Sequence, residues 1–194
     1  MDVDPDLSAR FQPDLLRGER ILWTGRPDPS RLLTKADVFL IPFGLVWTGG
    51  VASLFVAGFG DPGPPGPVFL VMPLMFLAVG FYFVIGRFMV LRFRKRRTAY
   101  AVTDRRVLVR TEIVRRSLQA ASFATLPAIQ KSVRRDGSGS IRFGTNHPFA
   151  SMYKNTGLDF FGFAYGPSAP SFVDIPDVER VYRLVNDFAD RSNG

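Results

Sequence analysis

The sequence predicts a membrane protein built from a two-helix transmembrane hairpin and a basic cytoplasmic domain of α+β or all-β class. Three observations lead to this fold class. Two long runs without a charged residue, Val38–Gly60 and Pro62–Gly86, are separated only by Asp61. After Thr98 the apolar residues alternate with polar ones, which is the period of a β-strand. The chain then closes on a segment whose apolar residues follow the period of a helix.

Each apolar run is long enough to cross a bilayer, because a hydrocarbon core of about 30 Å needs about 20 helical residues. We expect a transmembrane region at 37–91, with helices at about 38–59 and 67–91. The Pro/Gly-rich connection at 60–66 cannot continue a helix, and its shortness predicts antiparallel neighbours. A signal peptide would begin near residue 1 and be shorter. A soluble protein would need a larger shell around two such helices.

Small and charged residues add detail to the hairpin. Small residues could let the two helices pack closely, and the alternative is that the scattered glycines are simply exposed to lipid. These residues are Gly44, Gly49, Gly50, Ala52, Ser53 and Gly58 in the first helix and Ala78 and Gly80 in the second. Arg87 falls in the last turn of the second helix, where a long side chain is expected to extend to the interface. Neither helix carries a charge at its middle, which transport pathways usually need, so the pattern favours an anchor.

The charge distribution predicts the orientation of the hairpin. The net charge is +8, and the connecting loop has no basic residue. The N-terminal segment 1–36 is neutral overall, with six basic and six acidic residues, whereas the domain 92–194 has 18 basic and nine acidic residues. Since basic residues favour the cytoplasmic side, we expect both termini in the cytoplasm and the hairpin in the plasma (inner) membrane.

The composition argues against an enzyme. The chain has no cysteine and a single histidine, His147, which excludes thiolate and multi-histidine metal sites. No phosphate loop, nucleophile elbow or zinc-protease motif occurs, so no catalytic residue, cofactor or metal is predicted. Asp159 and Asp174 stand alone in the sequence and are expected to be solvated or to cap a helix.

The C-terminal domain reads as a series of antiparallel strands followed by one packing helix. A hairpin joins the strand that begins at Thr98 to Arg106–Ile113, with Val107 and Val109 on the inner face and the opposite face exposed to water. Further strands are predicted at 117–123, 129–135 and 140–143, and a helix at 176–191. Asp136-Gly137, between the strands predicted at 129–135 and 140–143, is a typical signal of a β-hairpin turn.

Several short motifs together resemble the bacterial pleckstrin-homology-like (PH-like) membrane-protein family. They are Tyr100–Leu108, Leu126–Ile129, Gly137–Ile141, Ile175–Asp177 and, ahead of the hairpin, Glu19–Pro27. The resemblance implies a small curved barrel or sandwich capped by a C-terminal helix, and no enzymatic activity. The segment Thr145–Ser171 is longer than the family's core needs. Whether the segment around Trp23 joins the C-terminal domain is left open.

Basic residues are the first candidates for function. The predicted contacts with the membrane surface are Arg92, Arg94, Lys95, Arg96, Arg97, Arg105, Arg106 and Arg110. Arginine matches phosphate geometry, and basic residues beside an anionic membrane are attracted to it. Two alternatives are that the run after the second helix only sets the topology, and that the remaining arginines cover an ordinary solvated face of the sheet.

Aromatic residues are the second candidates. Phe160, Phe161, Phe163 and Tyr165 lie in a glycine-punctuated segment and could form an exposed surface for a partner protein. The alternative is that many of the aromatic residues between Phe143 and Phe172 fill the core.

Three functions are compatible with these features. The favoured one is a non-enzymatic, membrane-anchored binding or scaffold module that contacts anionic lipid headgroups, a partner membrane protein or both. The second is an accessory subunit of a membrane transport or enzyme complex. Nucleic-acid binding ranks lowest, because the aromatic residues do not interleave with the basic ones as base-stacking surfaces require.

Overall fold

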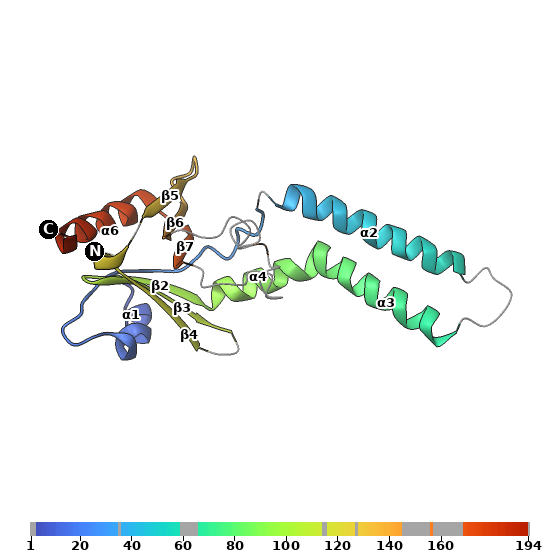
Figure 1. Cartoon of the computed structure of the whole chain (residues 1–194), viewed down its shortest axis with the longest axis horizontal. Helices are drawn as coiled ribbons and strands as arrows, with labels where there is room; N and C mark the ends of the chain where they lie inside the picture. The colour runs from blue at the N-terminus through green and yellow to red at the C-terminus, as the bar shows by residue number, and fades with distance from the viewer. Residues whose placement is uncertain are drawn as a thin grey trace. The chain divides into compact units, whose positions relative to one another are not determined.

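The computed structural model describes residues 3–34, 36–58, 66–113, 116–126, 128–144, 156 and 169–193 (Figure 1). The chain divides into two compact units. One, the β unit, contains the residues up to Arg31 together with the strands and the helix that follow Arg92. The other, the helical unit, contains Leu32–Leu91.

The helical unit is built from long apolar helices. They are α2 (Asp37–Gly58) and α3 (Pro67–Phe81), which continues through a π-helical turn (Tyr82–Gly86) into α4 (Arg87–Arg96). Two stretches, Asp37–Gly58 and Val71–Arg96, are long and apolar enough to cross a membrane by length and composition. The prediction that the second helix ends near residue 91 is wrong, because the helix continues through the basic run to Arg96.

Small residues allow α2 to approach α3 and the π-helical turn. A Cβ atom on Gly80 would lie 2.2 Å from Thr48 Oγ1, and one on Gly44 would lie 3.0 Å from Val84 Cγ2. Beside them, Trp47 Nε1 donates a hydrogen bond to the backbone oxygen of Phe76 at 3.2 Å. Gly44 and Gly80 therefore lie in the helix contact, whereas a Cβ atom on Gly49 or Gly50 would meet nothing within 4 Å, so only some of the small residues take part in the packing.

The β unit contains two antiparallel sheets. Sheet A has the order β1 (Ile21–Gly25), β2 (Thr98–Thr103), β3 (Arg106–Glu112) and β4 (Arg116–Ser122). Sheet B has the order β5 (Ile129–Val133), β6 (Gly139–Phe143) and β7 (Ser171–Ile175). The helices of the unit are α1 (Pro5–Phe11) and α6 (Val178–Asn193), with short 3₁₀ turns at Gln12–Asp14 and Phe123–Thr125.

The main core lies between the two sheets and α6. It contains Trp23, Tyr100, Val102, Val107 and Val109 from sheet A, Ile141, Phe143, Phe172 and Ile175 from sheet B, and Val178, Val181, Val185 and Ala189 from α6, with Phe123. The predicted antiparallel strands and C-terminal helix are thus present. The segment around Trp23 joins the C-terminal domain, because it forms β1, an edge strand of sheet A that pairs with β2.

The opposite face of sheet A is also covered, which corrects the prediction that it is exposed to water. Leu7 and Phe11 of α1 pack with Ala99, Ala101 and Leu108 in a second apolar cluster. Asp4 caps α1 by accepting a hydrogen bond from the backbone of Asp6 at 2.9 Å. Alternation identified the strands correctly, but it could not reveal that a segment about a hundred residues earlier would cover their polar-looking face.

Candidate functional site

The exposed end of α4 carries the basic residues that best fit a surface contact. Arg92, Arg96 and Arg97 are exposed, whereas Arg94 is half-buried and Lys95 is buried. Arg92 and Arg96 are four residues apart and so share one side of the helix. The Arg97 guanidinium lies 5.0 Å from the centre of the Phe93 ring. Cations in the last turn of a helix also interact favourably with its dipole.

Lys95 has a structural role instead. Its ammonium lies 2.6 Å from Asp174 Oδ2 and also donates a hydrogen bond to the backbone oxygen of Arg31. Lys95 is 3% exposed and Asp174 is 2% exposed, so water does not screen this ion pair. Arg134 Nη2 lies 2.5 Å from the second carboxylate oxygen of Asp174. We therefore remove Lys95 from the candidate lipid contacts, because this pairing and burial hold its charge inside the β unit.

Asp174 corrects a second prediction. The sequence suggested an aspartate that is solvated or caps the last helix, but Asp174 belongs to β7 and α6 begins at Val178. Its backbone has a positive φ of 51°, and its N–H donates to Ser140 Oγ at 3.2 Å. The buried carboxylate joins α4 and the turn after β5 to β7, which no local pattern in the sequence indicates.

Arg106 is likewise engaged within the protein. Its Nε and Nη2 atoms lie 2.8 and 2.9 Å from the two carboxylate oxygens of Glu19, a bidentate ion pair. Thr103 Oγ1 and the backbone N–H of Leu16 also donate to Glu19, at 2.8 and 2.6 Å. Burial raises the pKa of Glu19, but the hydrogen bonds from Arg106, Leu16 and Thr103 outweigh this and leave the pKa below its ordinary value.

Arg110, like Arg106, is paired with carboxylates of the β unit. It is 9% exposed, its Nε donates to Glu112 at 2.7 Å, and its Nη1 lies 3.2 Å from Asp14. Arg106 and Arg110 therefore attach the N-terminal segment to sheet A. We leave both out of the candidate lipid contacts, because their charges are neutralised by neighbouring carboxylates.

The remaining predicted contact, Arg105, is exposed but lies away from the end of α4. In the β2–β3 hairpin Thr98 faces Thr111, and Val102 faces Val107 at the turn. Five residue steps along β2, at about 3.3 Å each, therefore separate the start of the strand from its end by about 17 Å. The structure thus does not join Arg105 to the cations at Arg92–Arg97 in one patch.

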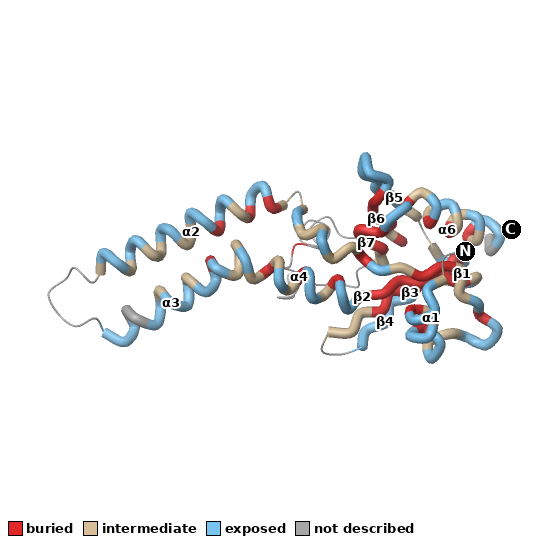
Figure 2. Tube along the Cα trace, turned by 180° about the vertical axis from the view of Figure 1, so that it is seen from behind, coloured by how far each residue is buried: buried red, intermediate tan, exposed pale blue. Residues whose placement is uncertain are grey.

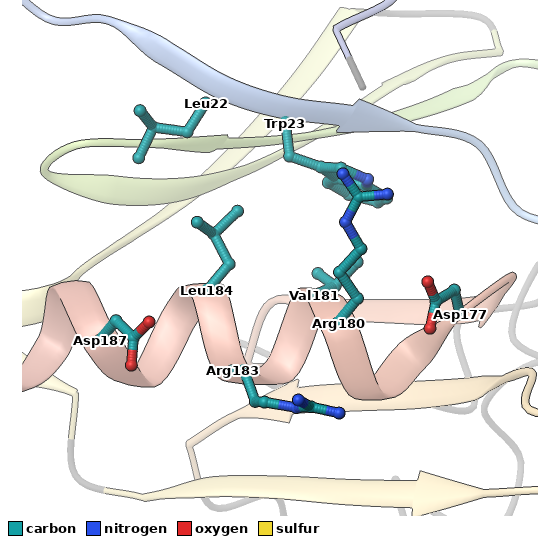
Figure 3. Close-up of a pocket in the computed structure, with 8 residues that line it drawn as sticks. All are labelled: Leu22, Trp23, Asp177, Arg180, Val181, Arg183, Leu184 and Asp187. Atoms are coloured by element: carbon teal, nitrogen blue, oxygen red, sulfur yellow. The ribbon is translucent and has the colours of Figure 1, made fainter. Parts of the chain in front are cut away.

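A groove lies between β1 and α6 within the β unit. Its volume is about 490 Å³, and it is lined by Leu22, Trp23, Asp177, Arg180, Val181, Arg183, Leu184 and Asp187. Leu184 and Arg180 point from α6 toward β1, whereas Arg183 extends away from it (Figure 3). The register of β1 shifts between Ile21 and Trp23, a bulge that alters which side chains of this edge strand turn toward the groove.

The predicted aromatic partner surface cannot be placed. Phe160, Phe161, Phe163 and Tyr165 lie outside the described residues. The two aromatic residues that flank the segment are in the core, since Phe143 and Phe172 have ring centres 4.9 Å apart. Within the described part of the chain, no group of three or more His, Cys, Asp or Glu side chains is arranged to hold a metal ion.

Comparison with protein families adds one finding. The sequence model of the family described as "Bacterial PH domain" matches residues 44–189, which is well over half of the chain. The match begins inside α2 and ends in α6, so it includes the long apolar helices as well as most of the β unit. Comparisons with curated proteins and with solved structures give no match.

Proposed function

Because the chain belongs to the bacterial PH domain family, we propose that it is a membrane-anchored, non-enzymatic binding module whose exposed arginines contact anionic lipid headgroups. The observation that carries the proposal is the position of Arg92, Arg96 and Arg97. They are exposed, and they lie at the end of the stretch Val71–Arg96, which is long and apolar enough to cross a membrane, or directly after it.

Chain connectivity supports the lipid contact. If Val71–Arg96 crosses the bilayer, its basic end lies at the cytoplasmic surface, where the positive-inside bias places such residues. Asp37–Gly58 forms the other half of the anchor, and both termini are then cytoplasmic. Each basic residue near an anionic surface contributes about 1 kcal/mol, so the three exposed arginines contribute at most about 3 kcal/mol.

The lipid contact would orient the β unit and select the lipids that surround it. It is not needed to attach the chain to the membrane. Two spanning helices hold the chain in the bilayer without help from surface charge. The three arginines would then gather anionic lipids around the base of the β unit. Arg94 is half-buried and contributes less contact area than its neighbours.

The test is retention of anionic lipid by the full-length protein. The protein is purified in mild detergent from membranes of known lipid composition, and the bound lipids are quantified by mass spectrometry. The variant Arg92→Gln/Arg96→Gln/Arg97→Gln should lose bound anionic lipid by at least several-fold. The matched control, Arg17→Gln/Arg20→Gln/Arg105→Gln, removes the same charge from exposed residues at the far end of the β2–β3 hairpin and should retain it.

Equal lipid retention by the two triple variants would contradict the proposed contact. Anchoring is tested separately by washing membranes with alkaline carbonate. The wild-type chain should remain in the pellet, and its release into the supernatant without detergent would overturn the anchoring part of the proposal.

A further inference from the structure

The second apolar helix is not regular along its whole length, because the π-helical turn Tyr82–Gly86 separates α3 from α4. A π-helical turn contains one residue more than the α-helical turn that it replaces, and such turns are often found at functional sites. The backbone N–H of Arg87 donates to Tyr82 O, five residues back. In a regular α-helix it would donate to Phe83 O, four residues back. The extra residue therefore lies between Tyr82 and Arg87.

The side chain of Arg87 supports this turn. Its Nε donates to Phe83 O at 2.6 Å, so it occupies the carbonyl oxygen that the backbone N–H of the same residue bypasses. Its Nη1 pairs with Asp37 at the start of α2, and both side chains are buried. Helix α2 also reaches the turn at Gly44, where a Cβ atom would lie 3.0 Å from Val84 Cγ2. Arg87 thus joins the π-helical turn to α2.

The buried and exposed sides of α4 follow from this turn. Arg87, Leu91 and Lys95 recur every four residues and are 0%, 1% and 3% exposed. Arg92 and Arg96, each one position further along the chain, are exposed. Figure 2 shows buried residues recurring between exposed ones along α4. Because one residue turns an α-helix by about 100°, the extra residue in the π-helical turn decides which side of α4 is buried.

We infer that Arg87 and the π-helical turn position the arginines of the lipid contact, an inference that rests on the proposed function. With the extra residue in the turn, Arg87, Leu91 and Lys95 share the buried side of α4. Arg92 and Arg96 are then left at the surface. As a regular α-helix, the same sequence would bring neighbouring positions to the buried side. Arg87 is buried itself, so it acts on lipid binding through the orientation of α4.

Deletion of Ile85 from the full-length protein should preserve the lipid contact. Ile85 lies in the π-helical turn, and its side chain is exposed. Without it, Tyr82 is four residues before Arg87, and the hydrogen bond between their backbones becomes an ordinary α-helical one. Helix α4 then keeps its orientation, and we expect this variant to retain anionic lipid as well as the wild type does.

Deletion of Met89 is the matched comparison. Met89 is also apolar and exposed, but it lies in α4, where no extra residue can absorb the deletion. Relative to Arg87, the rest of α4 would rotate by one residue step, so Arg92 and Arg96 would turn to the buried side. We expect this variant to lose bound anionic lipid by at least several-fold, in the same mass-spectrometric assay.

Cysteine labelling reports the orientation of α4 independently of lipid, since the native chain contains no cysteine. Leu91→Cys should be protected from a maleimide and Arg92→Cys should react, both in the otherwise native protein and after deletion of Ile85. Deletion of Met89 should reverse this order. The inference is overturned if deletion of Ile85 exposes Leu91→Cys, or if deletion of Met89 leaves it protected.

The role of Arg87 is tested by rescue. Asp37→Asn/Arg87→Met removes the hydrogen bond to Phe83 O without leaving an unpaired buried charge. The turn should then become regular α-helix, and Leu91→Cys should become reactive. Further deletion of Ile85 should protect it again, because a regular helix with one residue less restores the buried side of α4.

An ion pair that merely stabilises the helices predicts no such rescue. Protection of Leu91→Cys before the deletion, or reactivity after it, would therefore overturn the positioning role of Arg87. Retention of lipid by Arg92→Gln/Arg96→Gln/Arg97→Gln would instead contradict the proposed function, and it would leave the labelling results unchanged.

Discussion

The β unit and the helical unit each bury an ion pair, and the two pairs are built differently. Asp174 of the β unit faces two cations, Lys95 and Arg134. Asp37 of the helical unit faces one, Arg87, and its second oxygen accepts hydrogen bonds from Thr34 at the start of α2. All of these side chains except Arg134 and Thr34 are almost completely buried.

Arg87 is less fully satisfied than Lys95. Its Nε donates to the backbone oxygen of Phe83 at 2.6 Å, and its guanidinium lies 4.4 Å from the centre of the Phe88 ring. Among the described residues its Nη2 has no hydrogen-bond partner. Arg87 is thus buried and paired with Asp37, the first residue of α2.

The difference shows that burial alone does not define the role of an ion pair. Asp174 holds together segments that are distant in the sequence, 79 residues apart for the contact with Lys95. Asp37 and Arg87 join the starts of α2 and α4. Breaking an ion pair lowers the free energy of unfolding by an amount that depends on which buried charges are left without a partner. An uncompensated buried charge is strongly destabilising.

Breaking the pair in the β unit should have the largest effect. Asp174→Ala leaves two cations facing each other, so we expect a loss of about 3–5 kcal/mol in the free energy of unfolding. The measurement is thermal or denaturant unfolding of the full-length protein in detergent. Asp174→Asn is the matched control, because asparagine also tolerates the positive φ of this residue. If Asp174→Asn is as stable as wild type, the charge is not what stabilises this junction.

Breaking the pair in the helical unit should cost somewhat less. Arg87→Met leaves Asp37 buried but still hydrogen-bonded to Thr34, and we expect a loss of about 3 kcal/mol. Adding Asp37→Asn removes the unpaired charge and should recover much of that loss. A double variant that is no more stable than Arg87→Met would contradict this account. The readout is the melting temperature of the detergent-purified protein.

The bidentate pair between Glu19 and Arg106 should contribute less and depend on pH. Because the pKa of Glu19 is lower in the folded protein than in the unfolded chain, its contribution is present above the unfolded value, near 4.5, and is lost as the pH falls through the folded pKa. Glu19→Gln should cost about 1–3 kcal/mol at pH 7. It should also flatten the fall in melting temperature between about pH 6 and about pH 3. An unchanged slope would exclude Glu19 as a source of the pH dependence.

The exposed pair between Lys131 and Glu179 should have the smallest effect. The two side chains are 33% and 42% exposed, so water screens their attraction. Glu179→Ala should change the free energy of unfolding by less than about 1 kcal/mol. A loss comparable to that of Asp174→Ala would mean that burial does not separate the strong pairs from the weak ones. Both variants can be measured in the same unfolding experiment.

Much of the fold could be predicted from sequence because its signals are local. The β2–β3 hairpin, the strands near residues 117–123, 129–135 and 140–143, and the last helix all carry their own periodicity. The sequence does not predict strand β7, because Ser171–Ile175 is short and follows a long segment without a strand signal. The sequence does not decide whether β1 joins the domain, because its pairing partner, β2, lies more than 70 residues further along the chain.

The candidate site was predicted only in part. That Arg92, Arg96 and Arg97 contact the membrane surface stays a prediction, and the sequence assigned the same role to Lys95, Arg106 and Arg110, which the structure pairs with carboxylates. Lys95 and Arg106 are paired with carboxylates from distant segments, and Arg110 is paired with Asp14 from a distant segment as well as with Glu112 of its own strand. Glu19 and Arg106, for example, are 87 residues apart in the sequence.

Two long apolar helices, a basic run at the end of the second and an antiparallel β domain closed by a helix can all be predicted from the amino-acid sequence. Hydropathy and periodicity are properties of neighbouring residues, so they are visible before the chain folds. Only the tertiary structure decided which charges remain on the surface. Whether an arginine meets lipid, water or a carboxylate depends on which distant segments pack beside it, because the energy of a charge is set by its surroundings in space.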